Sequence, residues 1–160
     1  MAPTGEAFTK VATGRSHTYA LDSTGMLTAT SYAGHVDREA PEGTFIDIDT
    51  EDLACGIRTD GSPLCWEPDD PAAAEEDYLT LEAPTGVYEQ VCLATENIAC
   101  ALDVDGVVQC WGASESINAV PTGYEYLQVA CGYHRVCALT TDGQIVCWGV
   151  DGAGETVPPT

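Results

Sequence analysis

The chain has almost no positive charge. Its 160 residues contain five lysines and arginines against 26 aspartates and glutamates, so the formal net charge is −21, and Lys10 is the only lysine. A surface of this sign repels nucleic-acid phosphates and anionic lipids, which argues against direct binding to either. Three explanations of the acidity stay open: a solubilising surface adapted to high salt, steering toward a basic partner, and mimicry of a nucleic acid.

Long apolar runs and helical periodicity are also missing. No stretch of about 18 apolar residues occurs, so we expect no transmembrane helix. The segment Met1–Glu6 has neither the basic start nor the apolar run of a secretory signal, so none is expected there. No segment keeps a 3.6-residue apolar period, which predicts little helix. Hydrophobic residues nevertheless make up 44% of the chain, enough for a packed core.

A proline followed by small residues returns at near-constant spacing. It stands at Pro3, Pro41, Pro84, Pro121 and Pro158, at intervals of 38, 43, 37 and 37 residues. Such a period is typical of a repeat protein, in which each repeat is one supersecondary unit. We therefore expect a single domain over residues 1–160, made of four units. Their approximate bounds are 3–40, 41–83, 84–120 and 121–160.

Each unit has the local pattern of β-structure. Short alternating runs are bounded by turn residues, and a Thr-Gly or Asp-Gly pair separates two of the runs in every unit. Asp-Gly between β-rich runs is a strong hairpin signal. In the third unit we predict a three-residue loop, Val104–Gly106, with Gly106 in the left-handed conformation that costs glycine little.

This hairpin register places cysteines opposite one another in three of the four units. The expected pairs, each separated by ten residues, are Cys55/Cys65, Cys100/Cys110 and Cys137/Cys147. The first unit lacks both cysteines and carries Tyr19 and Ala29 instead, so the two positions keep or lose cysteine together. Joint presence favours cross-strand disulfides, and the alternative is buried free thiols. Cys92 and Cys131 remain; they either bridge neighbouring units or stay unpaired.

The fourth unit carries a family resemblance. Residues 129–139 read Val-Ala-Cys-Gly-Tyr-His-Arg-Val-Cys-Ala-Leu, and an Asp-Gly turn and Cys-Trp-Gly follow. This pattern resembles the regulator of chromosome condensation repeat, and the resemblance covers nearly the whole chain. It implies an all-β propeller with one blade per repeat that serves as a protein-binding platform. The cysteines resemble those of secreted bacterial members, including the β-lactamase-inhibiting propeller. No inhibitor residue, and no residue for nucleotide exchange in small GTPases, can be matched here.

The number of units departs from the family. Familiar members close with seven blades, whereas this chain has four repeats. We expect a closed four-bladed ring in a monomer, because the chain begins and ends at the same phase of the repeat. The alternative is a homodimer in which each chain supplies half of an eight-bladed ring. An open half-ring would leave apolar blade faces in water, which soluble monomers avoid.

No pattern for chemistry stands out. The sequence has no Ser-His-Asp order, phosphate-binding glycine loop or Cys-x-x-Cys knuckle, so we predict no catalytic residue, cofactor or metal site. Asp103–Gly106 begins like a calcium loop but lacks the later ligands. His17 and His134 recur in only two units, which favours loop anchoring over acid–base catalysis.

The second unit contains an insertion of roughly eight residues, judged against the loops of its siblings. We interpret it as a docking loop for a basic protein partner, with a tyrosine as anchor. The expected partner-binding residues are Asp69, Asp70, Glu75, Glu76, Asp77 and Tyr78. The alternative is a solvated surface loop.

The sequence favours a non-catalytic protein-interaction or assembly module. The cysteines indicate an oxidising destination, either extracellular or on a virion, and the cytoplasm stays open. A secreted enzyme inhibitor, or a lectin or hydrolase using loops at the mouth of the ring, is the alternative. Exposed Trp66, Trp111 and Trp148 would favour the lectin, whereas buried tryptophans would favour the interaction module.

Overall fold

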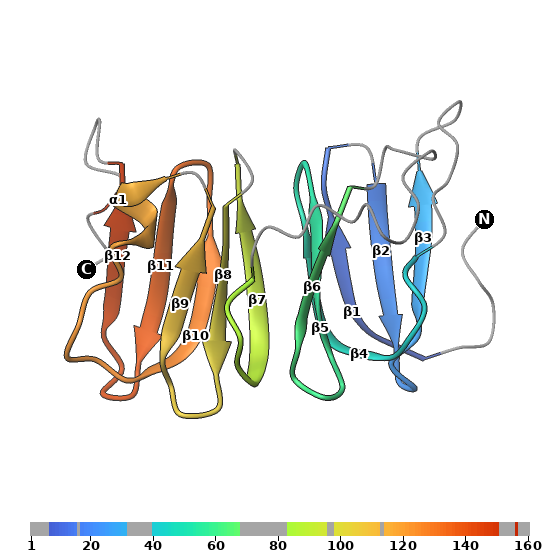
Figure 1. Ribbon diagram of the computed structural model, residues 1–160, viewed down its shortest axis with the longest axis horizontal. Coiled ribbons are helices and arrows are strands. Elements are labelled where there is room, and N and C mark those ends of the chain that lie inside the picture. Colours follow the sequence, from blue (N-terminus) through green and yellow to red (C-terminus); the bar gives the residue numbers. More distant parts are fainter. Residues whose placement is uncertain are drawn as a thin grey trace.

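The computed structural model describes residues 7–15, 17–31, 40–67, 83–95, 98–112, 114–150 and Thr156. Within them the chain forms four three-stranded antiparallel sheets, and each sheet uses consecutive strands of one repeat (Figure 1). The prediction of an all-β propeller with four blades is confirmed. A four-residue helix, α1 (Glu115–Asn118), follows the third sheet. No helix in this part of the chain is long and apolar enough to span a membrane.

The strands follow the repeat order. The first blade consists of β1 (Phe8–Thr13), β2 (His17–Asp22) and β3 (Leu27–Ser31). The second consists of β4 (Phe45–Thr50), β5 (Ala54–Arg58) and β6 (Pro63–Trp66). The third consists of β7 (Tyr88–Ala94), β8 (Ile98–Asp103) and β9 (Val108–Trp111). The fourth consists of β10 (Tyr126–Cys131), β11 (Arg135–Thr140) and β12 (Ile145–Gly149).

The hairpin between β8 and β9 has the predicted three-residue loop. The Asp103 N–H donates to the Val107 carbonyl at 3.0 Å, and the Gly106 N–H donates to the Asp103 carbonyl at 3.1 Å. Gly106 has φ +78°, as expected for the left-handed position. The Asp103 carboxylate accepts from the N–H groups of Asp105 and Val107, so the aspartate side chain fixes the turn.

The first strand of every blade carries the same β-bulge. In each case one extra residue follows the aromatic or apolar residue that opens the strand pairing. The bulges lie between Phe8 and Lys10, Phe45 and Asp47, Tyr88 and Gln90, and Tyr126 and Gln128. A bulge disrupts the ladder locally and re-aims the groups beside it. In the third and fourth blades, Val91 and Val129 stand three residues after the aromatic residue. Their N–H groups donate to a side chain of the preceding blade.

The blades pack face to face in chain order. Three apolar clusters fill the spaces between the first and second, second and third, and third and fourth blades. Neighbouring blades meet mainly through their first strands, β1, β4, β7 and β10. We call these four first strands the inner strands.

The ring does not close within one chain. The first and fourth blades lie at opposite ends of the long axis (Figure 1), and no extensive contact joins them among the described residues. The expectation of a closed four-bladed ring is therefore wrong. The three blade-to-blade interfaces do not bring the first and fourth blades together, so the four blades form an open arc.

Candidate interaction surfaces

A backbone hydrogen bond joins each blade to the next at the tip of a hairpin. The carbonyl of the hairpin glycine accepts from the N–H of the aromatic residue that begins the next blade. The three bonds are Phe45 N–H to Gly25 at 2.8 Å, Tyr88 N–H to Gly61 at 2.9 Å, and Tyr126 N–H to Gly106 at 2.8 Å. At Gly25 an added Cβ would lie 2.9 Å from the Phe45 carbonyl oxygen, and φ is +87°. Glycine is therefore required there by both the turn and the contact.

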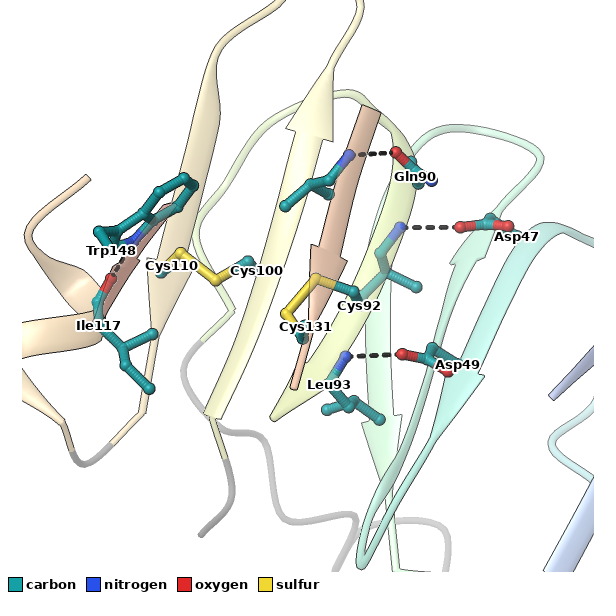
Figure 2. Close-up of a disulfide and its surroundings, with 12 residues drawn as sticks. Asp47, Asp49, Gln90, Cys92, Leu93, Cys100, Cys110, Ile117, Cys131 and Trp148 are labelled. Carbon is teal, nitrogen blue, oxygen red and sulfur yellow. Dashed lines mark hydrogen bonds between the residues drawn. A yellow bond between two sulfur atoms is a disulfide. The ribbon is translucent and has the colours of Figure 1, made fainter. Parts of the chain in front are cut away.

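Polar side chains on the inner strands make a second set of bonds between blades (Figure 2). Asp47 Oδ2 accepts from the Val91 N–H at 2.8 Å, and Gln90 Oε1 accepts from the Val129 N–H at 2.9 Å. Asp47 and Gln90 occupy the same position of their blades, directly after the bulge. Val91 and Val129 lie in the edge strands of their sheets, and this side chain satisfies a backbone donor there that would otherwise be buried without a partner.

The next position along the inner strand links the blades in two different ways. Asp49 Oδ2 accepts from the Leu93 N–H at 2.8 Å between the second and third blades. Between the third and fourth blades, the equivalent residues are Cys92 and Cys131, and they form a disulfide (Figure 2). Of the two possibilities left by the sequence, the structure shows the bridge between neighbouring units.

The three predicted hairpin disulfides are present. They are Cys55–Cys65, Cys100–Cys110 and Cys137–Cys147. In each pair the residues are directly opposed across the hairpin, with Cα atoms 4.0 Å apart. An ordinary non-hydrogen-bonded pair has Cα atoms about 4.5 Å apart, so the strands draw together at these points.

Asp49 is a charged group in a largely buried position. Burial raises the pKa of this carboxyl above 3.8, and the hydrogen bond from the Leu93 N–H partly offsets the effect. Nearby Lys10, which forms an ion pair with Asp47, also favours the ionised form of Asp49. The second and third blades are thus linked by two carboxyl groups, and burial makes it costly to ionise one of them, Asp49.

Replacing Asp49 by asparagine is expected to leave stability unchanged or raise it at neutral pH. The amide oxygen can still accept from Leu93, and no charge has to be buried. Because the folded-state pKa of Asp49 is raised, its favourable contribution is fully present below the unfolded-state pKa and is lost as pH rises through the folded-state pKa. Urea unfolding from pH 3.5 to 7 should therefore show the wild type losing stability relative to Asp49→Asn as pH rises.

Asp49→Ala is the control for the hydrogen bond. It leaves the Leu93 N–H without its acceptor, so we expect a loss of about 1–3 kcal/mol in the free energy of unfolding. If the asparagine variant were as unstable as the alanine variant, the proposed role of the acceptor would be refuted.

The two open ends of the arc expose positions that are buried at every internal interface. On the first blade, Phe8 is 38% and Val11 63% exposed. Their counterparts, Phe45, Tyr88, Tyr126, Ile48, Val91 and Val129, are at most 3% exposed. On the fourth blade, Gln128 is exposed, Ile145 is 39% exposed and Leu139 is half-buried. We name the Phe8–Val11 side of the first blade the leading face and the Gln128–Ile145 side of the fourth blade the trailing face.

The tryptophans are core residues. Trp66, Trp111 and Trp148 are at most 7% exposed. This confirms that tryptophan recurs at one position of the repeat because it packs between blades. The Trp66 Nε1–H donates to the Tyr19 hydroxyl of the preceding blade at 2.9 Å, and the Trp148 Nε1–H donates to the Ile117 carbonyl at 2.8 Å. None of these rings lies on the surface, so they do not form the sugar-stacking platform that a lectin would need.

The predicted docking loop lies outside the described residues, so Asp69, Asp70, Glu75, Glu76, Asp77 and Tyr78 stay a prediction. Over the described ranges, no group of three or more histidines, cysteines and carboxylates is placed to hold a metal ion. Among the basic side chains that the structure describes, Lys10 pairs with Asp47, and Arg15 Nε lies 3.3 Å from Asp52 Oδ1.

Residues 127–155 match the family model of the regulator of chromosome condensation (RCC1) repeat. This segment is similar to an RCC1 repeat. It covers the fourth blade from β10 through β12, and the other three blades repeat its hairpin register and its bulge. At the level of sequence alone, no curated protein matches the chain significantly.

Solved structures with the same fold include RCC1 itself. Yeast RCC1 (Prp20) bound to Kap60 superposes with a TM-score of 0.68 at 19% identity, over 98% of this chain and 46% of that one. The ectodomain of the Physcomitrella patens receptor kinase CR4 gives 0.73 at 21% identity, covering 93% and 42%. The CRINKLY WD40 ectodomain of Arabidopsis thaliana ACR4 gives 0.70 at 23%, covering 94% and 52%. The chain thus has an RCC1-type propeller fold and spans about half the length of these proteins.

The hydrogen bonds that Asp47 and Gln90 accept from the next blade were not predicted from the sequence, although a signal for them existed. Two residues after the aromatic or apolar residue that opens each blade stand Lys10, Asp47, Gln90 and Gln128. All four are polar at one phase of the repeat, in a strand otherwise rich in apolar residues. Aligning the repeats at this residue would have identified the position.

Proposed function

We propose that the chain is a non-catalytic module that binds a protein with a basic surface in an oxidising environment. The charge balance carries this proposal, because the chain has 26 carboxylates and five basic residues. In the part that the structure describes, Lys10 and Arg15 are paired with carboxylates of the chain itself. The resulting negative field attracts basic surfaces from solution and speeds their association. Yeast RCC1, which has the same fold, has been solved with a protein partner, Kap60, bound to it.

The four disulfides support the environment part of the proposal. Such bonds persist in extracellular spaces and on virion surfaces and are rare in the cytosol. Buried tryptophans favour the interaction module over the lectin. We assign the docking role to the acidic insertion, with Tyr78 as its apolar anchor, because this is the one segment without a counterpart in the other three repeats.

Neutralising the insertion should weaken partner binding. The variant replaces Asp69, Asp70, Glu75, Glu76 and Asp77 by their amides. A matched control replaces five exposed carboxylates on the blades, Glu42, Glu89, Asp105, Glu115 and Glu125. Both variants remove five negative charges, so they change the overall field equally and differ only in where the charge is lost.

The measurement is the association rate with the partner that the wild-type chain captures from native extract, followed at rising salt. We expect roughly a tenfold slower association for the insertion variant at low salt and a smaller effect for the control. Binding of the wild type should weaken as salt rises. Equal rates for both variants would remove the insertion from the proposal, and salt-independent binding would remove the basic partner.

A further inference from the structure

We propose that two copies of the chain close an eight-bladed ring, in which the leading face of each copy docks on the trailing face of the other. The described residues carry the inference, because the two open faces are complementary halves of an interface that the chain already builds three times. The proposal does not depend on the basic partner. Added salt should weaken the binding of that partner and strengthen the dimer, so the two interactions can be distinguished.

The backbone groups at the open ends match. At each internal interface a hairpin glycine carbonyl accepts from the N–H of the residue that opens the next blade. Gly143 occupies the glycine position in the fourth blade, in a hairpin of the same geometry, with φ +84° and its N–H donating to Thr140. Phe8 occupies the opening position in the first blade. One face therefore presents the acceptor and the other the donor of the same bond.

The hydrogen bonds from inner-strand side chains to the next blade can also be extended across the two open faces. Gln128 stands where Asp47 and Gln90 stand in their blades, and it is exposed on the trailing face. Val11 follows the bulge of β1 as Val91 and Val129 follow theirs. Docking the leading face on the trailing face would bring the Gln128 amide to the Val11 N–H, as Gln90 meets Val129 at 2.9 Å.

The apolar surfaces also correspond. Val11 and Phe8 lie uncovered on the leading face, although their counterparts in the other blades are buried. On the trailing face Ile145 is 39% exposed, whereas its counterpart Val108, which faces the fourth blade, is 4% exposed. A twofold arrangement covers both faces of both copies at once, so a closed dimer leaves no blade face open.

One position makes the new interface weaker than the internal ones. Thr30 stands where the other blades have Trp66, Trp111 and Trp148. Less apolar surface is buried there, and two chains of charge −21 repel each other. Salt shortens the range of that repulsion from about 30 Å at 0.01 M to about 3 Å at 1 M. We therefore expect a reversible dimer that strengthens as salt is added.

The test is sedimentation equilibrium of the 160-residue chain over a range of concentrations and from 0.05 to 1 M NaCl. The expected mass rises with concentration and salt to twice the 16.8 kDa of one chain and no further. Thr30→Trp should tighten association roughly tenfold or more, because it restores the indole present at the three internal interfaces. A chain that stays monomeric throughout, including as Thr30→Trp, would overturn the proposal, as would open-ended assemblies heavier than two chains.

Two aspartate variants locate the interface. Val11→Asp places a charge in the leading face and should abolish dimerisation. Leu127→Asp is the matched control, since Leu127 is the bulge residue of β10 and its counterpart Ile46 stays exposed at an internal interface. It adds the same charge without entering the interface. Both side chains are exposed in the single chain, so a urea midpoint close to that of the wild type is expected for both. Equal loss of dimer in both variants would refute the assigned faces.

Discussion

Replacing Trp66 by alanine is expected to lower the free energy of unfolding by about 3–5 kcal/mol, a large part of the stability of a small domain. The side chain is fully buried between the first and second blades. Its ring meets Tyr19 edge-on at a centroid distance of 5.5 Å and lies 6.1 Å from Phe45. Alanine would leave a cavity there and remove the hydrogen bond to the Tyr19 hydroxyl. Urea unfolding followed by tryptophan fluorescence and far-ultraviolet circular dichroism measures the effect.

Two further variants separate the contributions at Trp66. Trp66→Phe keeps much of the apolar volume but loses the Nε1–H donor, so its loss should be smaller than that of the alanine variant. Val104→Ala, at an exposed hairpin position, should change stability by less than about 0.5 kcal/mol. If Trp66→Ala were no more destabilising than Val104→Ala, the packing of the first blade on the second would not contribute to stability as described.

Removing the disulfide between blades is expected to cost more than removing a disulfide within one. Cys92 and Cys131 are 39 residues apart, and loop-closure entropy assigns such a bond about 4 kcal/mol. Cys100 and Cys110 are ten residues apart, which corresponds to about 3 kcal/mol. Urea unfolding of the two double alanine variants, under non-reducing conditions, compares these losses directly.

The variants are made as pairs because three cysteines lie side by side. Cys92 is directly opposite Cys100, which is in turn directly opposite Cys110 (Figure 2). A single Cys131→Ala change would leave a thiol next to the Cys100–Cys110 disulfide, where exchange could re-pair the cysteines. A hairpin variant that lost more stability than the variant between blades would show that the loop-entropy account does not govern this fold.

The blades were predictable because their signals are local. An Asp-Gly pair between alternating runs fixes a hairpin and its register within about twenty residues, and the register then places Cys100 opposite Cys110. The pairing of Cys92 with Cys131 depends on how one blade stacks on the next, which no local pattern encodes. The sequence therefore left two possibilities that only the arrangement of β7 against β10 decides.

The closure of the ring was misjudged for a related reason. The expectation of closure rested on the repeat phase at the two ends of the sequence, and that phase does not contain the angle between successive blades. That angle follows from contacts such as Asp47 with Val91 and Gly61 with Tyr88, which act between blades. The same contacts could have been suspected from the polar residue at one phase of every repeat. Their partners are backbone N–H groups, which leave no trace in the side-chain pattern.

In the part of the chain that the structure describes, each blade makes its extensive contacts with its neighbours in the sequence, and this has a consequence for how the protein is made. A blade needs the blade synthesised before it, but nothing that emerges from the ribosome much later, so structure can grow from the N-terminus while translation continues. Cysteines ten residues apart can meet as soon as their own hairpin is available. The bond between Cys92 and Cys131 must wait for a second blade, and it then fastens the fourth blade to the third.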